Sequence, residues 1–486
     1  MGEPKEESML LAREHRIYAE YAVPKAVGTM VVPTIISQII TVIYNLADTW
    51  YVGLTGNAAA VAAISLCLPV YNIMTAFGNL FGIGGSSVMT RAIGTGRTDR
   101  ARTAFALSVR FGLLSAALYG LLLLLFARPF LMCIGGDAAS IGYAVWYARV
   151  TMVMGGIPTI LSAVLAHLIR STGQAKPASF GITLGAALNM GLDPLFMFVL
   201  LPPGNEVLGA AIATAISNCV SLLYFVIYIL RSDEGVFCLT LESGSPRRSV
   251  LSDILRSGAP SFFLLAAGQI SNFFLNGMIA DMGASAAVAG IGVVRKIDSL
   301  AYAVNQGITQ GMLPIVAYCY ASHLIPRMKS VVAFSSLCTM SFSLVCSVCS
   351  YLFAPQLIGF FINDADTIYF GARFLRVLCI AVAIYPVLFV IIAVFQAVGH
   401  SREPFMLSLL HKGSFDILLF FVIRKVWGLD YILWASPTMA AVALAASLVL
   451  VRRLFRSLGR CQEEFGQQQK NNVKESQEKP WLSCFL

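Results

Sequence analysis

Apolar runs of about 20 residues recur along almost the whole chain, separated by short polar breaks. A run of that length is what an α-helix needs to cross the hydrocarbon core of a bilayer. The composition agrees, because 57% of the residues are hydrophobic and only 12% are charged, whereas soluble domains carry roughly 25% charged residues. We therefore predict an all-α integral membrane protein. A transmembrane β-barrel would show short segments of alternating hydrophobicity instead.

The N-terminus, the cysteines and the net charge each bear on the class of protein. The first residues, MGEPKEESMLLAREHR, are polar and of mixed charge, so we expect no cleavable signal peptide. The eleven cysteines lie mostly within apolar runs and lack CxxC spacing, so we interpret them as small buried side chains. The net charge of +9 could suit nucleic acid, but the placement of the basic residues argues against such a partner. We see no signature of an enzyme and expect no cofactor.

Twelve transmembrane helices are predicted from the apolar windows. The breaks between them contain turn-forming residues, as in LTGN, GTGRTDR, IGGD, LPPGN and VGHSREP. The helices are expected at residues 27–52, 61–88, 103–126, 143–169, 178–201, 208–230, 253–279, 286–316, 330–353, 372–397, 404–423 and 430–452.

Basic residues are unevenly divided between the two sides of this twelve-helix path. If the N-terminus is cytoplasmic, the outer loops hold little beyond Arg128, Arg424 and Lys425. The cytoplasmic segments hold Arg97, Arg100, Arg102, Arg170, Lys176, Arg231, Arg247, Arg248, Arg327, Lys329, Arg402, Arg452, Arg453 and Arg456. This asymmetry follows the positive-inside rule. We predict a multi-pass protein of the plasma membrane with both termini in the cytoplasm.

An internal repeat appears when the sequence is shifted against itself by 227 residues. VPTIISQIITVIYNLADTWYVG (32–53) aligns with APSFFLLAAGQISNFFLNGMIA (259–280). At the same offset, Pro177 of RSTGQAKP aligns with Pro404 of QAVGHSREP. Each half contains six helices, so both halves begin on the same side of the membrane. Such parallel repeats are typical of transporters that open a cavity to each side in turn.

The repeat predicts four parts of the chain. An N-terminal lobe with helices 1–6 and a short cytoplasmic N-terminus covers residues 1–230, and a cytoplasmic linker covers 231–256. A C-terminal lobe with helices 7–12 covers 257–456. Residues 457–486 form a cytoplasmic polar tail that we expect to be disordered.

Five stretches resemble the multidrug and toxic compound extrusion (MATE) family of antiporters. They are LADTWYVG in helix 1, GNLFGIGGSSVMTRAIGTGR in helix 2, RSTGQAKP before helix 5, ALNMGLDPLFMF in helix 5 and GAAIATAIS in helix 6. Their order and the repeat make the resemblance specific, and it covers residues 17–456. The glycine-rich helix 2 is similar to the bacterial MepA-like branch. The resemblance implies the MATE fold and a multidrug exporter of organic cations driven by H⁺ or Na⁺.

Two acids lie inside predicted helices of the N-terminal lobe, Asp48 and Asp193. An ionisable group in a membrane span costs about 2.5–3.5 kcal/mol on insertion scales, so each indicates function. Asn189 lies one turn before Asp193 on the same helical face, and Thr214 adds a hydroxyl. These oxygens suit Na⁺, or protons shared by two carboxylates. The resemblance implies that these four residues form the coupling-cation site. Tyr44, one turn before Asp48, is placed to donate a hydrogen bond to it.

Both acids have an alternative interpretation. Asp48 lies 23 residues after Lys25, about 34 Å along a helix. That length would put it at the outer interface beside Trp50, solvated and without function. Asp193 could belong to local turn chemistry, because Pro194 frees a carbonyl of the preceding turn. The resemblance favours the coupling site over both alternatives.

The second lobe carries its charges in another arrangement. VVRKIDSLAY in helix 8 contains Arg295, Lys296 and Asp298, and LLHKGSFDILLF in helix 11 contains Lys412 four residues before Asp416. Each acid has a basic neighbour within one turn, so we interpret these residues as internal ion pairs that hold the lobe together. Uncompensated negative charge is then confined to the first lobe.

The second lobe also departs from part of the family. Some members carry acids on helices 7 and 10. This chain has Gln269, Asn272 and Asn276 on helix 7 and no acid on helix 10. The departure favours H⁺ over Na⁺ as the coupling ion.

Methionine and aromatic residues offer candidates for a substrate cavity. Tyr71, Met74 and Met190 belong to a set that is mostly core, but a subset can line an adaptable drug cavity. In the predicted cycle, H⁺ or Na⁺ from outside neutralises Asp48 and Asp193 and lowers the affinity for a cationic substrate. We expect a monomer.

Two other functions stay open at this point. A flippase of a lipid-linked precursor would share the two-lobe architecture and would need a basic central cavity, which the Lys and Arg residues of helices 8 and 11 could supply. A channel or receptor is disfavoured by the repeat with its asymmetric acids.

Overall fold

The computed structural model describes residues 14–138, 140–202, 204–232, 235–239, 247–281 and 285–478, and over these ranges it contains helices and no strand. The first half contains η1 (Arg16–Glu20), α2 (Val23–Leu54), α3 (Ala58–Gly94), α4 (Thr98–Cys133), α5 (Ile141–Ala148), η2 (Arg149–Met154), α6 (Gly156–Ser171), α7 (Ala175–Pro194), η3 (Leu195–Leu200) and α8 (Glu206–Leu230). The second half contains α9 (Arg247–Ala280), α10 (Ser285–Ala321), α11 (Ile325–Leu352), α12 (Ala354–Gly359), α13 (Ala365–Val398), α14 (Arg402–Lys412), α15 (Ser414–Val426), η4 (Leu429–Trp434) and α16 (Ala435–Glu478).

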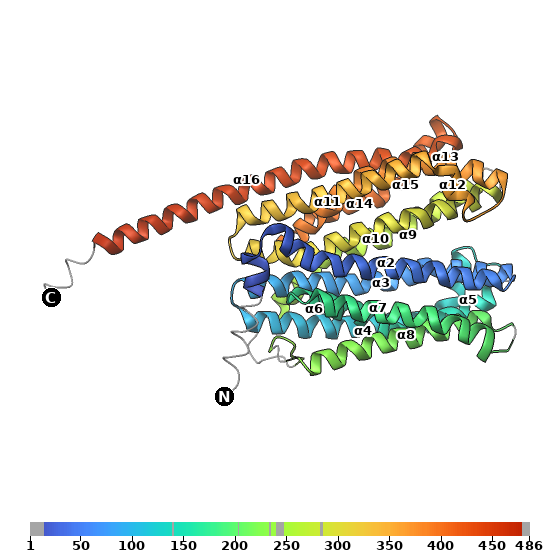
Figure 1. The fold of residues 1–486 in the computed structure, drawn as a ribbon, viewed down its shortest axis with the longest axis horizontal. Helices are drawn as coiled ribbons and strands as arrows, with labels where there is room; N and C mark the ends of the chain where they lie inside the picture. Colours follow the sequence, from blue (N-terminus) through green and yellow to red (C-terminus); the bar gives the residue numbers. More distant parts are fainter. Residues whose placement is uncertain are drawn as a thin grey trace.

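The long helices run side by side along the bundle (Figure 1). Ten are long and apolar enough to cross a membrane. Another is a bent pair, in which the α5–η2 segment meets α6 at 48°. With α10, which is 37 residues long and carries Arg295, Lys296 and Asp298, these make twelve passes. The predicted all-helical membrane fold is confirmed, and each predicted span falls on one of these passes.

The outer surface of α4 shows why the bundle belongs in lipid. Leu114, Leu118, Leu121 and Leu125 are each more than half exposed. On the opposite face of the helix, Ala116 and other small residues are buried. A continuous exposed apolar stripe of this kind is unfavourable in water and marks a surface that faces acyl chains.

Local chemistry explains where the helices begin and end. The Asn57 side chain caps α3 by accepting hydrogen bonds from the backbone N–H groups of Ala59 and Ala60, at 3.1 and 3.2 Å. The C-terminal cap of α13 is Gly399, whose φ of +90° lies in the left-handed region that favours glycine. These two breaks are among those that the sequence predicts.

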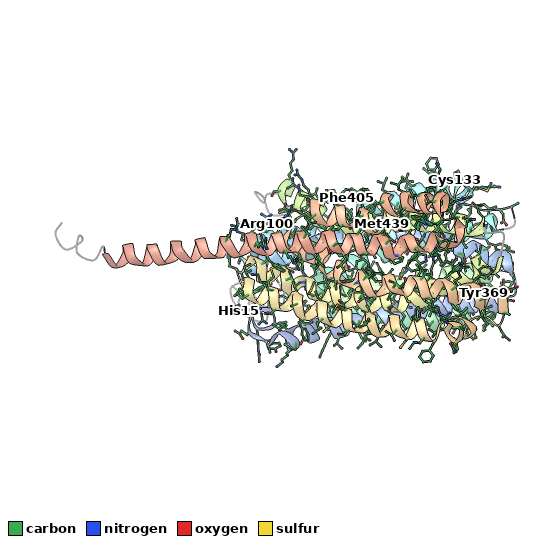
Figure 2. All side chains as sticks on the ribbon, turned by 90° about the horizontal axis from the view of Figure 1, so that it is seen from above. His15, Arg100, Cys133, Tyr369, Phe405 and Met439 are labelled. Atoms are coloured by element: carbon green, nitrogen blue, oxygen red, sulfur yellow. The ribbon has the colours of Figure 1, made fainter. Side chains whose placement is uncertain are left out.

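The two ends of the bundle differ. His15 and Arg100 lie at the end from which α16 projects, and Cys133 and Tyr369 lie at the opposite end (Figure 2). We call the first the terminal end and the second the far end. In the half of the bundle nearer the terminal end the lobes touch backbone to backbone: Gly258 of α9 has no room for a Cβ because of the Leu80 backbone of α3.

Hydrophobic packing gives the lobes one shared core and one separate core. The shared core includes Met30 of α2 and Met312 of α10, near the terminal end, and continues through the N-terminal lobe. The separate core fills the far half of the C-terminal lobe around Leu275, Ile291 and Phe420. The lobes are therefore joined at the terminal end and separate toward the far end, where α2 and α9 diverge (Figure 1).

Two segments differ from their sequence-based assignments. α9 begins at Arg247, so residues 247–256, assigned to the linker, are already helical. α16 continues beyond the bundle to Glu478 (Figure 1), so the disorder expected after residue 456 is wrong as far as that residue. Residues 1–13, 233–234, 240–246 and 479–486 of the predicted N-terminus, linker and tail lie outside the described ranges.

Candidate functional site

Asn189, Asp193 and Thr214 meet in the interior of the N-terminal lobe. Asn189 and Asp193 lie on one face of α7 and are 2% and 0% exposed. The Asn189 Nδ2 group donates to Asp193 Oδ1 at 3.2 Å and to Thr214 Oγ1 of α8 at 3.2 Å. One amide thus links a carboxylate on its own helix to a hydroxyl on the next, and the four-residue spacing had predicted the first of these two neighbours.

Asp193 stands where α7 changes its winding. Pro194 is the last residue of α7, and the π-helical segment η3 follows it directly. Proline cannot donate a backbone hydrogen bond, which loosens the helix at this point, and π-turns within helices are frequent at functional sites. The buried carboxylate therefore lies beside a local irregularity of the helix and not in a solvated turn.

Asp48 points into the same interior from α2. The residue is half-buried, and its Oδ1 is enclosed without a hydrogen-bond partner. The carboxylate is close enough to interact electrostatically with Asp193 and with Tyr147 of α5. This burial contrasts with Trp50, which is 61% exposed, and it does not support the interfacial alternative. No hydrogen bond joins Asp48 to Asp193 or Asn189 in the described part of the chain.

Tyr44 does not make the bond that its position suggested. It interacts electrostatically with Tyr71 of α3 and with Asp48. Asn218 of α8 interacts with Tyr71 and donates a hydrogen bond to Thr159 Oγ1 of α6 at 2.8 Å. Tyr44 therefore belongs to a group of polar side chains from α2, α3, α8 and α6 beside the carboxylates.

Sequence reasoning missed Tyr147 and Asn218. Both are polar residues inside predicted spans, which is the signal that could have drawn attention to them. Nothing in the sequence alone shows that α5 and α8 bring them beside α2 and α3.

Three buried oxygen atoms at this site have no hydrogen-bond donor: Asp48 Oδ1, Asp193 Oδ2 and Asn189 Oδ1. Neither carboxylate has an ion pair with a basic side chain among the residues that the structure describes. Unpaired carboxylate and amide oxygens in a buried place suit a proton or a hard cation such as Na⁺. The three oxygen atoms can therefore bind either a proton or Na⁺.

The charges of the second lobe form a different kind of cluster. Asp298 accepts a hydrogen bond from the Tyr385 hydroxyl at 3.1 Å, and Asp416 accepts one from the Ser271 hydroxyl at 2.6 Å. Lys412 and Arg295 influence Asp298 electrostatically. However, none of the ion pairs within 4.0 Å among the described residues involves these groups. The basic residues therefore act on these acids at longer range, Lys412 on both of them, and the direct partners of the two carboxylates are hydroxyl groups.

A break in the helix explains part of this difference. α14 ends at Lys412 and α15 begins at Ser414. Lys412 and Asp416 are four residues apart but stand on two helices, so the spacing of a continuous helix does not apply. A Cβ at Gly413 would meet the Leu409 carbonyl oxygen at 2.6 Å, which favours glycine at the break. Lys296 is half-buried on α10, and no ion pair is found for it in the described chain.

A small cavity of about 40 Å³ lies between the lobes, formed by α3, α6, α9, α10 and α13. Its polar lining includes Asn79, Ser86, His167, Gln306, Gln310 and Gln396. No Lys or Arg lines it. Of the predicted substrate contacts, Met74 is fully buried in the shared core. Tyr71 and Met190 are half-buried, and neither they nor Met74 line this cavity.

Comparison with known families identifies this architecture. The sequence model of the MatE family matches residues 33–195 and again 260–422, which together are more than half of the chain. This chain belongs to the MatE family. The two matches are 227 residues apart, which is the offset of the internal repeat, so each lobe carries one copy of the family unit. The family resemblance seen in the sequence is confirmed.

Relatives of this MatE-family chain include bacterial export proteins. The multidrug export protein MepA of Staphylococcus saprophyticus is 27% identical over 420 residues, covering 86% of this chain and 91% of the relative. The MepA of Staphylococcus haemolyticus is 24% identical, covering 90% and 95%.

Solved structures share the fold. An outward-facing multidrug resistance MATE transporter matches with a TM-score of 0.83 at 24% identity, covering 93% of this chain and 98% of that one. A MATE structure in complex with MaL6 matches with a TM-score of 0.85 at 23% identity, covering 92% and 99%. At these identities the likeness concerns the fold.

Proposed function

We propose that this chain exports small organic cations across the plasma membrane in exchange for an inward-moving cation. Family membership and relatives that are multidrug export proteins support transport. The observation that carries the coupling mechanism is the pair Asp48 and Asp193. Two carboxylates without basic partners share the interior of one lobe, and each keeps an unpaired buried oxygen. A bound cation stabilises two such carboxylates. Once one cation has neutralised them, a second cation binds more weakly, so the coupling ion and the substrate compete.

The direction of transport follows from the two ends of the bundle. The basic residues of the Arg97, Lys176, Arg327 and Arg402 loops fall at the terminal end, so the positive-inside rule places that end in the cytoplasm. The lobes touch there and separate at the far end. We therefore propose that the far end faces outward and that this arrangement is the outward-open state. In this state H⁺ or Na⁺ enters, neutralises the carboxylates, and releases a cationic substrate to the outside.

The coupling ion that we favour is H⁺. In the described part of the C-terminal lobe, Asp298 and Asp416 do not form a second acidic pair facing Asp48 and Asp193, because Tyr385 and Ser271 hold them within their own lobe. Na⁺ needs several oxygen ligands, whereas a proton needs only one carboxylate oxygen. The few oxygen ligands at the Asp48 site therefore favour H⁺.

Ethidium efflux from cells under separately imposed pH and Na⁺ gradients tests this proposal. We expect a pH gradient alone to drive efflux, and the D48N and D193N variants to lose about 90% or more of the gradient-driven rate. The matched control is D281N at the far end, where Asp281 pairs with Arg424 at 2.7 Å on the exposed surface. Such a pair contributes little, so D281N should export normally. Undiminished, gradient-dependent efflux by D48N would overturn the coupling site.

The flippase alternative is not favoured. It needs a basic cavity for phosphate groups between the lobes, and the residues that line the inter-lobe cavity are polar or apolar without Lys or Arg.

A further inference from the structure

A basic pocket at the terminal end of the C-terminal lobe has no part in the proposed cycle. Lys329 of α11 and Arg452, Arg456 and Arg460 of α16 line an open pocket of about 450 Å³, together with Phe455 and Gly459. The three arginines recur every fourth residue, so they share one face of α16. Lys329 reaches the same space from a helix more than a hundred residues earlier in the chain, and its Nζ lies 5.8 Å from the centre of the Phe455 ring.

The pocket stands at the boundary of the lipid-facing surface. α16 begins at Ala435 at the far end. Arg452 lies about 26 Å further along this helix, which is close to the hydrocarbon thickness of about 30 Å of a bilayer. Just before the arginines, Leu448 and Val449 are 38% and 50% exposed, and on α11 Leu337 is 57% exposed. Charged side chains therefore follow directly after apolar side chains that face acyl chains.

Among the side chains that the structure describes, none balances the positive charge of the pocket. None of the four basic side chains forms an ion pair in the part of the chain whose side chains the structure describes. α16 packs mainly on α13 and α14 and touches α11 only slightly, which leaves the space between α11 and α16 open. Four cations around one opening repel one another unless an anion enters.

We propose that this pocket binds the headgroup of an anionic phospholipid, with the acyl chains lying on the apolar surface below it. Guanidinium groups hold phosphate oxygens in bidentate geometry, and basic pockets between transmembrane helices on the cytoplasmic side are suited to such headgroups. The volume exceeds what a single phosphate ion needs. The adjoining exposed leucine and valine side chains favour a lipid over a free anion, because a free phosphate gains nothing from them.

Native mass spectrometry of the full chain in detergent tests the proposal. The protein is mixed with equal amounts of phosphatidylglycerol and phosphatidylcholine that carry the same acyl chains. We expect at least a tenfold preference for phosphatidylglycerol, weakening as the ionic strength rises. Equal retention of the two lipids would overturn the proposal. So would displacement of phosphatidylglycerol by an equal concentration of inorganic phosphate, because the site would then be one for free anions.

Variants assign the preference to this pocket. R452Q/R456Q removes two charges from the lining, and we expect about 30-fold weaker binding of phosphatidylglycerol. The matched control is R453Q/R231Q, which also removes two exposed charges at the terminal end; Arg453 adjoins Arg452 but does not line the pocket. The control should bind like the parent protein. Equal loss in both double variants would overturn a specific site.

A variant on the other helix guards against a folding defect. K329Q changes one exposed side chain of α11, and we expect about fivefold weaker binding with thermal unfolding unchanged in lipid-free detergent. If K329Q and R452Q/R456Q both hold phosphatidylglycerol as the parent does, the pocket is not a lipid site.

Discussion

Arg91 of α3 donates a hydrogen bond through Nη1 to the backbone carbonyl of Ala397 at the end of α13, at 2.9 Å. The same nitrogen approaches the Gln396 carbonyl at 3.3 Å, and Nη2 approaches Ser257 Oγ at 3.4 Å. The last carbonyls of a helix have no partner within the helix and carry partial negative charge. One side chain of the N-terminal lobe thus fastens two helices of the C-terminal lobe at the terminal end.

Loss of this fastening should open the terminal end. We expect R91Q to shift the population toward a state that is open at that end by about tenfold, since hydrogen bonds from a charged group contribute about 1.5–3 kcal/mol. The measurement is the distance distribution between spin labels at Arg97 and Ser330, which are exposed on opposite lobes. R376Q is the control, because Arg376 bonds the Tyr351 carbonyl within one lobe. An unchanged distribution in R91Q would show that the contact does not hold the lobes together.

Close helix contact at the terminal end should be sensitive to a single methyl group. In G258A the new Cβ would overlap the Leu80 backbone, so the lobes cannot close as observed. We expect slower ethidium efflux by about tenfold and a longer spin-label distance at the terminal end. G277A on the same helix α9 adds its methyl group to open space and should behave as the parent does. Equal efflux by the two variants would contradict the importance of this contact.

The Asn189 amide should matter for transport more than any other amide of the membrane region. N189A leaves Asp193 Oδ1 and Thr214 Oγ1 without their shared donor, and leaving a buried polar group unsatisfied costs about 1–3 kcal/mol. We expect efflux driven by a pH gradient to fall about tenfold. N276A, which removes an exposed amide from α9, should export normally. Normal efflux by N189A would separate this amide from the coupling site.

The acids of the C-terminal lobe should contribute to stability rather than coupling. S271A and Y385F each remove the hydroxyl that donates to a carboxylate, Asp416 and Asp298 respectively. We expect each variant to lower the unfolding free energy by about 1–3 kcal/mol and to keep the dependence of efflux on the pH gradient. The measurements are thermal unfolding in detergent and efflux at several external pH values. A changed pH dependence would instead assign a coupling role to this lobe.

The positions of the helices were largely predictable because their causes are local. Each predicted span needed only an apolar run of sufficient length and a break such as LTGN, where α2 ends at Leu54 and Asn57 caps α3. The Asn189 and Asp193 pair was predictable for the same reason, since a spacing of four residues in one helix fixes a shared face. The helical continuation of α16 beyond the bundle was missed because its polar composition was taken to indicate disorder.

Contacts between helices were predicted less well. Tyr44 stands one turn from Asp48 but donates no hydrogen bond to it, and it interacts more strongly with Tyr71 of another helix. Lys412 stands four residues from Asp416, but the break at Gly413 divides their helix. In both cases the sequence spacing predicted a contact with a residue nearby in the chain, whereas the contacts that form depend on how the helices pack.

The sequence by itself predicted twelve membrane spans in two related halves. The length of an apolar run is a property of one segment, and the repeat is found by aligning the sequence with itself. It also showed that two acids of the first half lack basic neighbours. Only the tertiary structure decided that Asp48 and Asp193 share one interior, that Arg91 meets Ala397, and that Lys329 and Arg456 line one pocket. These relations depend on how separate helices pack. That packing is set by many weak contacts between residues far apart in the sequence. A transporter must also alternate between two packing arrangements of similar free energy.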